Sequence, residues 1–270
     1  MKSRLLALLL VLCLCLGFAG CAKNDAADNP SNNPSQESTG DTQGTSEPTN
    51  DTSEPEVKKE ELTEDQITAL TKIISEITPL DYLGKSVKPT ELTNEELLRV
   101  CLYIYNPRHS GFASDTSEWV ITRKTEKYFG IENVTLDPTI TCPCGQTMAT
   151  YTSDNDCYNW DVENTHYLEH TAEAYNEMIE AYKLEDLYYV ELYKIFPDLM
   201  KNTNSDQMNF YATYADAEKQ ENALFSAANE TEFATALEEL DDTKKVKYTY
   251  VFKADDSGKK FVLQEYIIGE

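Results

Sequence analysis

The segment Ala22–Glu56 most constrains the fold, because it contains no valine, isoleucine, leucine or aromatic residue. It consists mainly of Asn, Asp, Ser, Thr, Pro, Gly and Glu, with eight acidic side chains against one lysine. Such a composition buries too little apolar surface to offset the entropy lost on ordering. We therefore expect a disordered tether with an r.m.s. reach of roughly 30–35 Å. Folding is then left to Val57–Glu270, whose 214 residues suffice for one domain with an apolar core.

This remaining segment is strongly acidic, with 40 acidic against 20 basic side chains, in a chain whose net charge is −25. A surface of this sign repels the phosphates of nucleic acids and of anionic lipid headgroups. The composition therefore argues against a nucleic-acid partner and against electrostatic docking on a membrane. Aromatic residues make up 10% of the chain, including 17 tyrosines, as expected of a globular body.

A targeting signal precedes the tether. Lys2 and Arg4 come before the apolar run 5–18, which is too short to span a bilayer comfortably and suits a signal peptide. The run leads into Phe-Ala-Gly-Cys at residues 18–21. Small residues before a cysteine resemble the lipobox of bacterial lipoproteins, in which the cysteine is lipidated and becomes the mature N-terminus. Phenylalanine stands where that family usually has an aliphatic residue.

The resemblance implies a signal peptide at 1–20, a lipidated Cys21 with its linker at 21–56, and an extracytoplasmic domain at 57–270. Two acyl chains such as palmitate suffice for stable anchoring. The acidic spacer is similar to those of exported lipoproteins of Gram-positive bacteria. The expected location is the outer face of the cell membrane, and the alternatives are a plain secreted protein or an uncleaved anchor.

Helix signals are concentrated in the first half of the body. Capping-box patterns at Thr63–Gln66 and Thr93–Glu96 predict two helices with apolar stripes. A third helix is expected within Ser117–Phe129, with Gly130 as its stop. Asn133–Trp160 has no helical period and predicts a long loop or short strands.

The second half predicts one more long helix and then mainly strands. The helix covers Asp161–Tyr182, with Tyr175, Met178 and Ile179 among its core residues. The strand segments are Tyr188–Phe196, Met208–Tyr214 and a closing hairpin of Val246–Lys253 with Lys260–Ile267, and a short helix at Glu232–Leu240 is capped by Thr231. Helices first and antiparallel strands last indicate an α+β fold with a curved sheet.

Two stretches, KVKYTYVFKADDSGKKFVLQEYI at 245–267 and TEKYFGIENVTLD at 125–137, resemble segments of uncharacterised Gram-positive surface lipoproteins. That resemblance implies a small curved-sheet fold, cystatin-like or nuclear-transport-factor-like, and no known active site.

The seven cysteines divide by position. Cys13 and Cys15 leave with the signal peptide, Cys21 becomes the anchor, and the body keeps four, namely Cys101, Cys142, Cys144 and Cys157. An even number outside the membrane favours disulfides. Pro143 makes the step between Cys142 and Cys144 stiff, so we expect each to pair outward, one of them with Cys157. Cys101 lies on the apolar stripe of its helix and is expected to be buried.

A structural zinc site is the alternative for the same cysteines, and no other cofactor is expected. Cys142, Cys144 and Cys157 with His166 or His170 would supply three thiolates and an imidazole. The Pro-Cys-Gly turn resembles a zinc-ribbon knuckle, although the spacing is C-x-C instead of C-x2-C.

The segment His166-Tyr-Leu-Glu169-His170 matches the H-x-x-E-H pattern and resembles the inverzincin peptidases. Histidines four apart share one helix face and can bind one metal, with Glu169 as general base. The third carboxylate ligand is not evident, and the domain is small for that family. A metal-dependent hydrolase is therefore the alternative function, and the preferred one is a non-catalytic binding domain.

Tyrosines are concentrated on the predicted strands. They either fill the core or form an exposed aromatic surface for a cell-wall component, another envelope protein or a small molecule. The set comprises Tyr188, Tyr189, Tyr193, Tyr211, Tyr214, Tyr248, Tyr250 and Tyr266.

Overall fold

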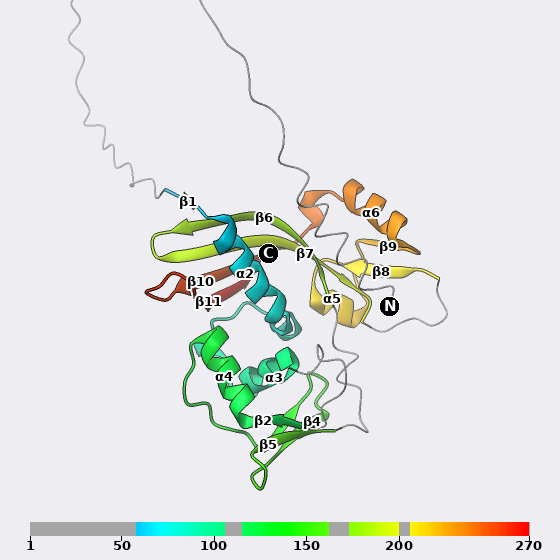
Figure 1. Ribbon diagram of the computed structural model, residues 1–270. Helices are drawn as coiled ribbons and strands as arrows, with labels where there is room; N and C mark the ends of the chain where they lie inside the picture. The colour runs from blue at the N-terminus through cyan, green and yellow to red at the C-terminus, as the bar shows by residue number, and fades with distance from the viewer. Residues whose placement is uncertain (1–57, 106–114, 162–172, 200–205, 270) are drawn as a thin grey trace, which may run out of the picture. The chain divides into compact units, whose positions relative to one another are not determined.

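The computed structural model describes residues 58–105, 115–161, 173–199 and 206–269 (Figure 1). These residues form helices and two antiparallel sheets, which confirms the α+β prediction. The signal peptide, Cys21 and the tether lie outside the described residues. Within the ranges that the structure describes, no helix combines the length and the apolar composition needed to cross a bilayer.

The larger sheet has seven strands in the order β1-β6-β7-β10-β11, and β8 joins it through β7 and carries β9 (Figure 1). Its strands are β1 (Glu60–Glu61), β6 (Tyr175–Leu184), β7 (Leu187–Pro197), β8 (Met208–Tyr211), β9 (Phe225–Ala227), β10 (Lys247–Ala254) and β11 (Phe261–Ile268). The smaller sheet has the order β2-β5-β4-β3. Its strands are β2 (Asp115–Ser117), β3 (Thr139–Thr141), β4 (Thr147–Thr152) and β5 (Cys157–Trp160).

The helices begin and end largely at their local signals. They are α2 (Glu64–Glu76), α3 (Asn94–Tyr105), α4 (Glu118–Phe129), α5 (Tyr214–Lys219) and α6 (Glu230–Glu239), with short 3-10 helices η1 (Thr78–Leu83), η2 (Pro89–Glu91) and η4 (Asp242–Lys244). Both predicted capping boxes are present: Thr63 and Gln66 exchange hydrogen bonds at the start of α2, as do Thr93 and Glu96 at the start of α3.

Gly130 ends α4 and sets its position against the larger sheet. Its φ of 64° is in the left-handed region that favours glycine. A Cβ atom at this position would lie 2.9 Å from Cγ1 of Val262 on β11. Glycine therefore serves both as the predicted stop of the helix and as the point of close approach between α4 and β11.

The predicted helix Asp161–Tyr182 is wrong from Tyr175 onward, because these residues form strand β6. β6 pairs with β7 along nearly its whole length through a tight turn at Glu185, whose φ is 57°. Met178 and Ile179, predicted to be core residues, are 42% and 41% exposed and lie at a register shift in this pairing. The apolar spacing fitted a helical stripe, but pairing with β7 overrides that local pattern.

Two boundaries also differ from the predictions. The strand expected to run to Tyr214 stops at Tyr211, because Thr213 caps α5 by accepting a hydrogen bond from the Asp216 N–H. The helix α6 starts at Glu230, and Asn229 caps it instead of Thr231. The short strands in 133–160, the strand at β7 and the closing hairpin are confirmed.

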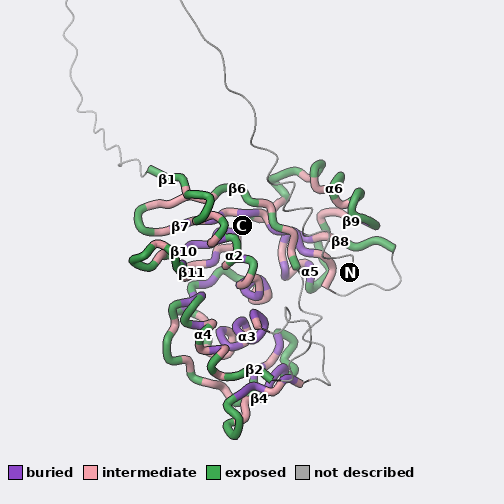
Figure 2. Tube along the Cα trace, in the orientation of Figure 1, coloured by how far each residue is buried: buried purple, intermediate pink, exposed green. Residues whose placement is uncertain are grey.

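Tyrosine fills much of the core. Of the eight tyrosines predicted on strands, six are buried, and only Tyr189 and Tyr193 are partly exposed. Tyr250 and Tyr266, opposite each other on β10 and β11, have ring centroids 5.0 Å apart. Most of α3 is also buried, whereas α6 has no buried residue (Figure 2). The core interpretation of these tyrosines is therefore confirmed for most of them.

A charged pair lies inside this aromatic core. Lys194 on β7 is fully buried, and its Nζ lies 2.6 Å from both carboxylate oxygens of Asp81 in η1. The Lys194 ammonium also donates to the hydroxyl of Tyr250, and the Tyr266 hydroxyl donates to Asp81, each at 2.6 Å. Burial lowers the pKa of Lys194 and raises the pKa of both phenols well above their usual value. This network joins η1 to three strands.

Candidate functional site

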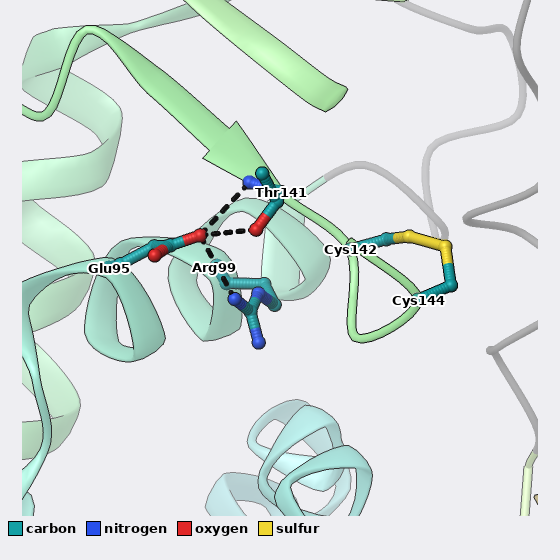
Figure 3. Close-up of a disulfide and its surroundings, with 5 residues drawn as sticks. All are labelled: Glu95, Arg99, Thr141, Cys142 and Cys144. Carbon is teal, nitrogen blue, oxygen red and sulfur yellow. Dashed lines mark hydrogen bonds and ion pairs between the residues drawn. A yellow bond between two sulfur atoms is a disulfide. The ribbon is translucent and has the colours of Figure 1, made fainter. Parts of the chain in front are cut away.

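The predicted cysteine pairing is wrong. Cys142 and Cys144 form a disulfide with each other in the turn between β3 and β4 (Figure 3). The Cys142 N–H donates to the Gln146 carbonyl at 2.8 Å, and the Gly145 N–H donates to the Cys142 carbonyl at 2.9 Å. This turn brings the two Cα atoms to 5.3 Å, which is within the usual range for a disulfide. The stiffness of the intervening proline therefore does not prevent pairing, because the chain reverses direction here.

The three-thiolate zinc site is not formed in this structure. Sulfur atoms in a disulfide are not thiolates, so Cys142 and Cys144 cannot act as zinc ligands while they are paired. Cys157 on β5 is a buried free thiol whose pKa is raised by burial. His166 and His170 lie outside the described residues. Among the described residues, no group of three histidine, cysteine, aspartate or glutamate side chains is arranged to hold a metal.

The remaining residues of the predicted hydrolase site also lie outside the described ranges. Glu169 belongs to the same segment as His166 and His170 and lies outside the described residues with them. Of the helix expected to carry all three, the part from Tyr175 onward is strand β6. Cys101 is a buried free thiol on α3, as predicted.

Beside the disulfide, a polar contact fastens the smaller sheet to α3 (Figure 3). The Glu95 carboxylate accepts hydrogen bonds from the hydroxyl and the N–H of Thr141 and from the Arg99 guanidinium at 3.1 Å. The Thr141 hydroxyl is the main reason that the pKa of Glu95 is lowered. We interpret this contact as structural, because it joins α3 to β3, which lie against each other.

The structure instead contains a groove formed by α4, α2 and the end of the β10–β11 hairpin, with a volume of about 690 Å³. Its apolar lining comes from Ile73, Val120, Phe261 and Val262. Five cationic side chains line the same groove, and we call it the basic groove. They are Arg123, Lys124, Lys127, Lys259 and Lys260. Only two carboxylates, those of Glu126 and Asp255, accompany them in the lining.

Trp119 is the most exposed large apolar side chain of the described residues, at 63%. It lines the basic groove, and the Arg123 guanidinium lies 5.0 Å from its ring centroid. Trp119, Arg123 and Glu126 also border a second hollow of about 510 Å³, which Thr122, Glu132 and Asn133 complete. One exposed tryptophan on α4 therefore lines two neighbouring hollows. Aromatic residues in such positions often act as anchors in interfaces.

The cations of the groove differ in whether they form ion pairs within the fold. Lys127 pairs with Glu76 at 3.3 Å and donates to the Tyr128 hydroxyl at 2.6 Å. In contrast, the side chains of Arg123, Lys259 and Lys260 form no ion pair with any carboxylate of the described residues. These three cations are therefore open to a partner.

One of the two carboxylates of the lining, that of Asp255, is already used by the turn that precedes β11. It accepts hydrogen bonds from the Ser257 hydroxyl at 2.7 Å and from the backbone N–H groups of Lys259 and Lys260 at 3.2 Å. These contacts, the Ser257 bond first, lower its pKa. Asp255 thus fixes the turn and presents the two lysine side chains to the groove.

Sequence reasoning missed this groove. The available signal was a pair of short basic runs, residues 123–127 and 259–260, in a body that is otherwise acidic. They are far apart in the chain, and only the packing of α4 on β11 brings them together (Figure 1). Comparison with known proteins does not add to this assignment: no protein-family model matches the chain, and no curated protein or solved structure is significantly similar to it.

Proposed function

We propose that this chain is a lipid-anchored extracytoplasmic binding protein without catalytic activity, and that the basic groove is its binding surface. The observation that carries the proposal is the concentration of five cationic side chains and an exposed tryptophan on one apolar groove, in a chain of net charge −25. Exposed apolar surface rimmed by charge marks interaction sites more often than chance. The partner is therefore expected to be an anion with apolar surface.

The overall negative charge does not prevent such binding. At physiological ionic strength the Debye length is about 8 Å, so distant carboxylates are largely screened. Charges that line a groove between low-dielectric walls keep a local field of their own sign. The acidic surface then repels anions that cannot reach the groove, which adds selectivity.

The binding proposal is tested by the fluorescence of Trp119. The chain has two tryptophans, and the other, Trp160, is buried and donates a hydrogen bond to Thr116 at 2.9 Å. We expect anionic probes (an acidic peptide, polyglutamate and polyphosphate) to shift the emission of Trp119 and to protect it from acrylamide. Polylysine is the control probe, and Trp119→Phe removes the signal. If no anionic probe changes Trp119 emission or quenching, the groove is not the binding surface.

The anchor is the second part of the proposal, and it rests on the sequence around Cys21. We expect the protein to fractionate with membranes and to incorporate a palmitate analogue. A Cys21→Ser variant should lose both properties. A wild-type protein recovered from the soluble fraction with an unmodified Cys21 would contradict lipidation.

A further inference from the structure

We infer that the ligand of the basic groove is an acidic polypeptide segment that inserts an apolar side chain beside Trp119. This inference rests on the proposed binding function and names the chemistry of the ligand. Two features of the groove carry it, namely its apolar lining and its unpaired cations.

The apolar lining favours a ligand with an apolar anchor. Ile73, Val120 and Val262 are partly exposed, and together with Trp119 they leave apolar surface in contact with water. A bare phosphate polymer or a simple polyol has no apolar group that could pack against this surface. An aromatic or aliphatic side chain would cover it, as anchors do in peptide-binding grooves.

The cations favour carboxylates on both sides of that anchor. Arg123 approaches the groove from α4, whereas Lys259 and Lys260 come from the turn that precedes β11. None of the three is ion-paired within the part of the chain that the structure describes. A peptide with acidic residues before and after one apolar side chain can pair with both groups while that side chain covers the apolar lining.

The composition of the chain's own tether argues against it as the occupant. Ala22–Glu56 carries eight acidic side chains, but it has no valine, isoleucine, leucine or aromatic residue to place beside Trp119. It therefore complements the charge of the groove and not its apolar lining. The inferred ligand is a separate polypeptide that has both features.

The inference is tested with full-length protein in mild detergent and fluorescein-labelled peptides of about twelve residues. The probe carries glutamates on both sides of a central Phe-Leu pair. One matched peptide has serine at the Phe-Leu positions, another has glutamine at every glutamate, and polyphosphate is the non-peptide polyanion. Fluorescence anisotropy gives the dissociation constants at two salt concentrations.

Three variants locate the binding. Trp119→Ala removes the apolar contact, and the double change Lys259→Glu with Lys260→Glu reverses the charge. The double change Lys219→Glu with Lys244→Glu makes the same charge change at exposed lysines of α5 and η4, which do not line the groove. We expect each groove variant to weaken binding of the probe at least tenfold, the control pair to change it less than threefold, and added salt to weaken it.

The outcomes separate the inference from the proposed function. If the serine peptide binds as tightly as the Phe-Leu peptide, or if polyphosphate alone binds in a manner sensitive to the groove variants, the ligand class is wrong and the groove remains a binding surface. If neither the peptide nor polyphosphate responds to the groove variants, the inference and the proposed binding surface both fail.

Discussion

Lys194 in the core and Lys260 in the basic groove carry the same ammonium group in opposite surroundings. Lys194 is fully buried, with Asp81 and Tyr250 as hydrogen-bond partners at 2.6 Å. The rings of Tyr248 and Tyr250 lie 5.3 and 5.1 Å from its Nζ. Lys260 is exposed and has no ion pair among the described residues. The difference follows from solvation, since a buried charge must replace its water with protein groups.

This comparison separates structural charges from those that can serve a ligand. Lys194, Asp81, Tyr250 and Tyr266 are all buried and bond to one another, so none of these groups is presented at the surface to another molecule. Arg123, Lys259 and Lys260 in the groove have no carboxylate partner among the described residues, so they can exchange their water for a ligand's carboxylates. Both sets are clusters of charge and aromatic rings, and they differ in burial and in ion pairing.

The largest expected effect comes from breaking the buried pair. Lys194→Met leaves the Asp81 carboxylate, 2% exposed, without its cation. We expect the free energy of unfolding to fall by about 3–5 kcal/mol, because an unpaired buried charge is poorly solvated. Urea denaturation of the wild-type and variant proteins measures the loss.

Two further variants make this test specific. Lys85→Met breaks a surface pair with Glu96 whose atoms are also 2.6 Å apart, and it should cost less than about 1 kcal/mol. Adding Asp81→Leu to Lys194→Met should restore most of the stability, since no charge is then left in the core. Equal losses for Lys194→Met and Lys85→Met would mean that burial does not set the difference.

The pH dependence sharpens the same comparison. Burial raises the pKa of the Tyr266 phenol well above its usual value near 10. Above that pH the unfolded chain loses a proton that the folded protein keeps, so stability falls by about 1.4 kcal/mol per pH unit for each such tyrosine. Burial lowers the pKa of Lys194, which makes stability rise with pH, but only below about pH 10.5. Above that pH the lysine of the unfolded chain has lost its proton as well.

Between about pH 10.5 and 11.5, Tyr266→Phe should therefore make the fall of unfolding free energy with pH less steep, by about 1.4 kcal/mol per pH unit. Urea titrations at fixed pH give the slope. Tyr189→Phe, at a partly exposed position, provides the control. A slope that Tyr266→Phe leaves unchanged would show that this phenol titrates in the folded protein as it does in the unfolded chain.

Features encoded by neighbouring residues could be predicted from the sequence. The capping boxes at Thr63 and Thr93, the stop at Gly130 and the closing hairpin each depend on a few adjacent residues, and all are present. The α+β class followed from the order of these elements. Of the two interpretations of the strand tyrosines, the one that places them in the core is confirmed at Tyr248 and Tyr250 on β10.

Features that depend on distant partners could not be predicted. Lys194 and Asp81 are 113 residues apart, and neither position differs locally from an ordinary surface charge. β6 resembles a helix until its pairing with β7 is known. The basic groove likewise requires the packing of α4 on β11. The Cys142–Cys144 bond depends on a backbone turn that the spacing alone does not reveal.

Removal of the disulfide is expected to lower the unfolding free energy by an intermediate amount. The disulfide belongs to neither the buried pair nor the basic groove. Its loop has only three residues, so in the chain-entropy account it restricts the unfolded state little. We expect Cys142→Ala with Cys144→Ala to lower the unfolding free energy by about 1.5 kcal/mol. Calorimetry of this variant, beside reduced wild-type protein, measures the effect. A loss above that of Lys194→Met would mean that the β3–β4 turn contributes more to folding than the buried pair.

The smallest expected effect on stability comes from the groove itself. Lys259→Glu with Lys260→Glu should change the unfolding free energy by no more than about 0.5 kcal/mol, because the two ammonium groups are exposed. The turn should persist, since Asp255 is bonded by backbone N–H groups that the substitutions keep. Urea denaturation beside Lys219→Glu with Lys244→Glu provides the measurement and its control. A loss above about 1 kcal/mol would mean that the groove lysines, like Lys194, stabilise the fold. The distinction that supports a binding role for the groove would then disappear.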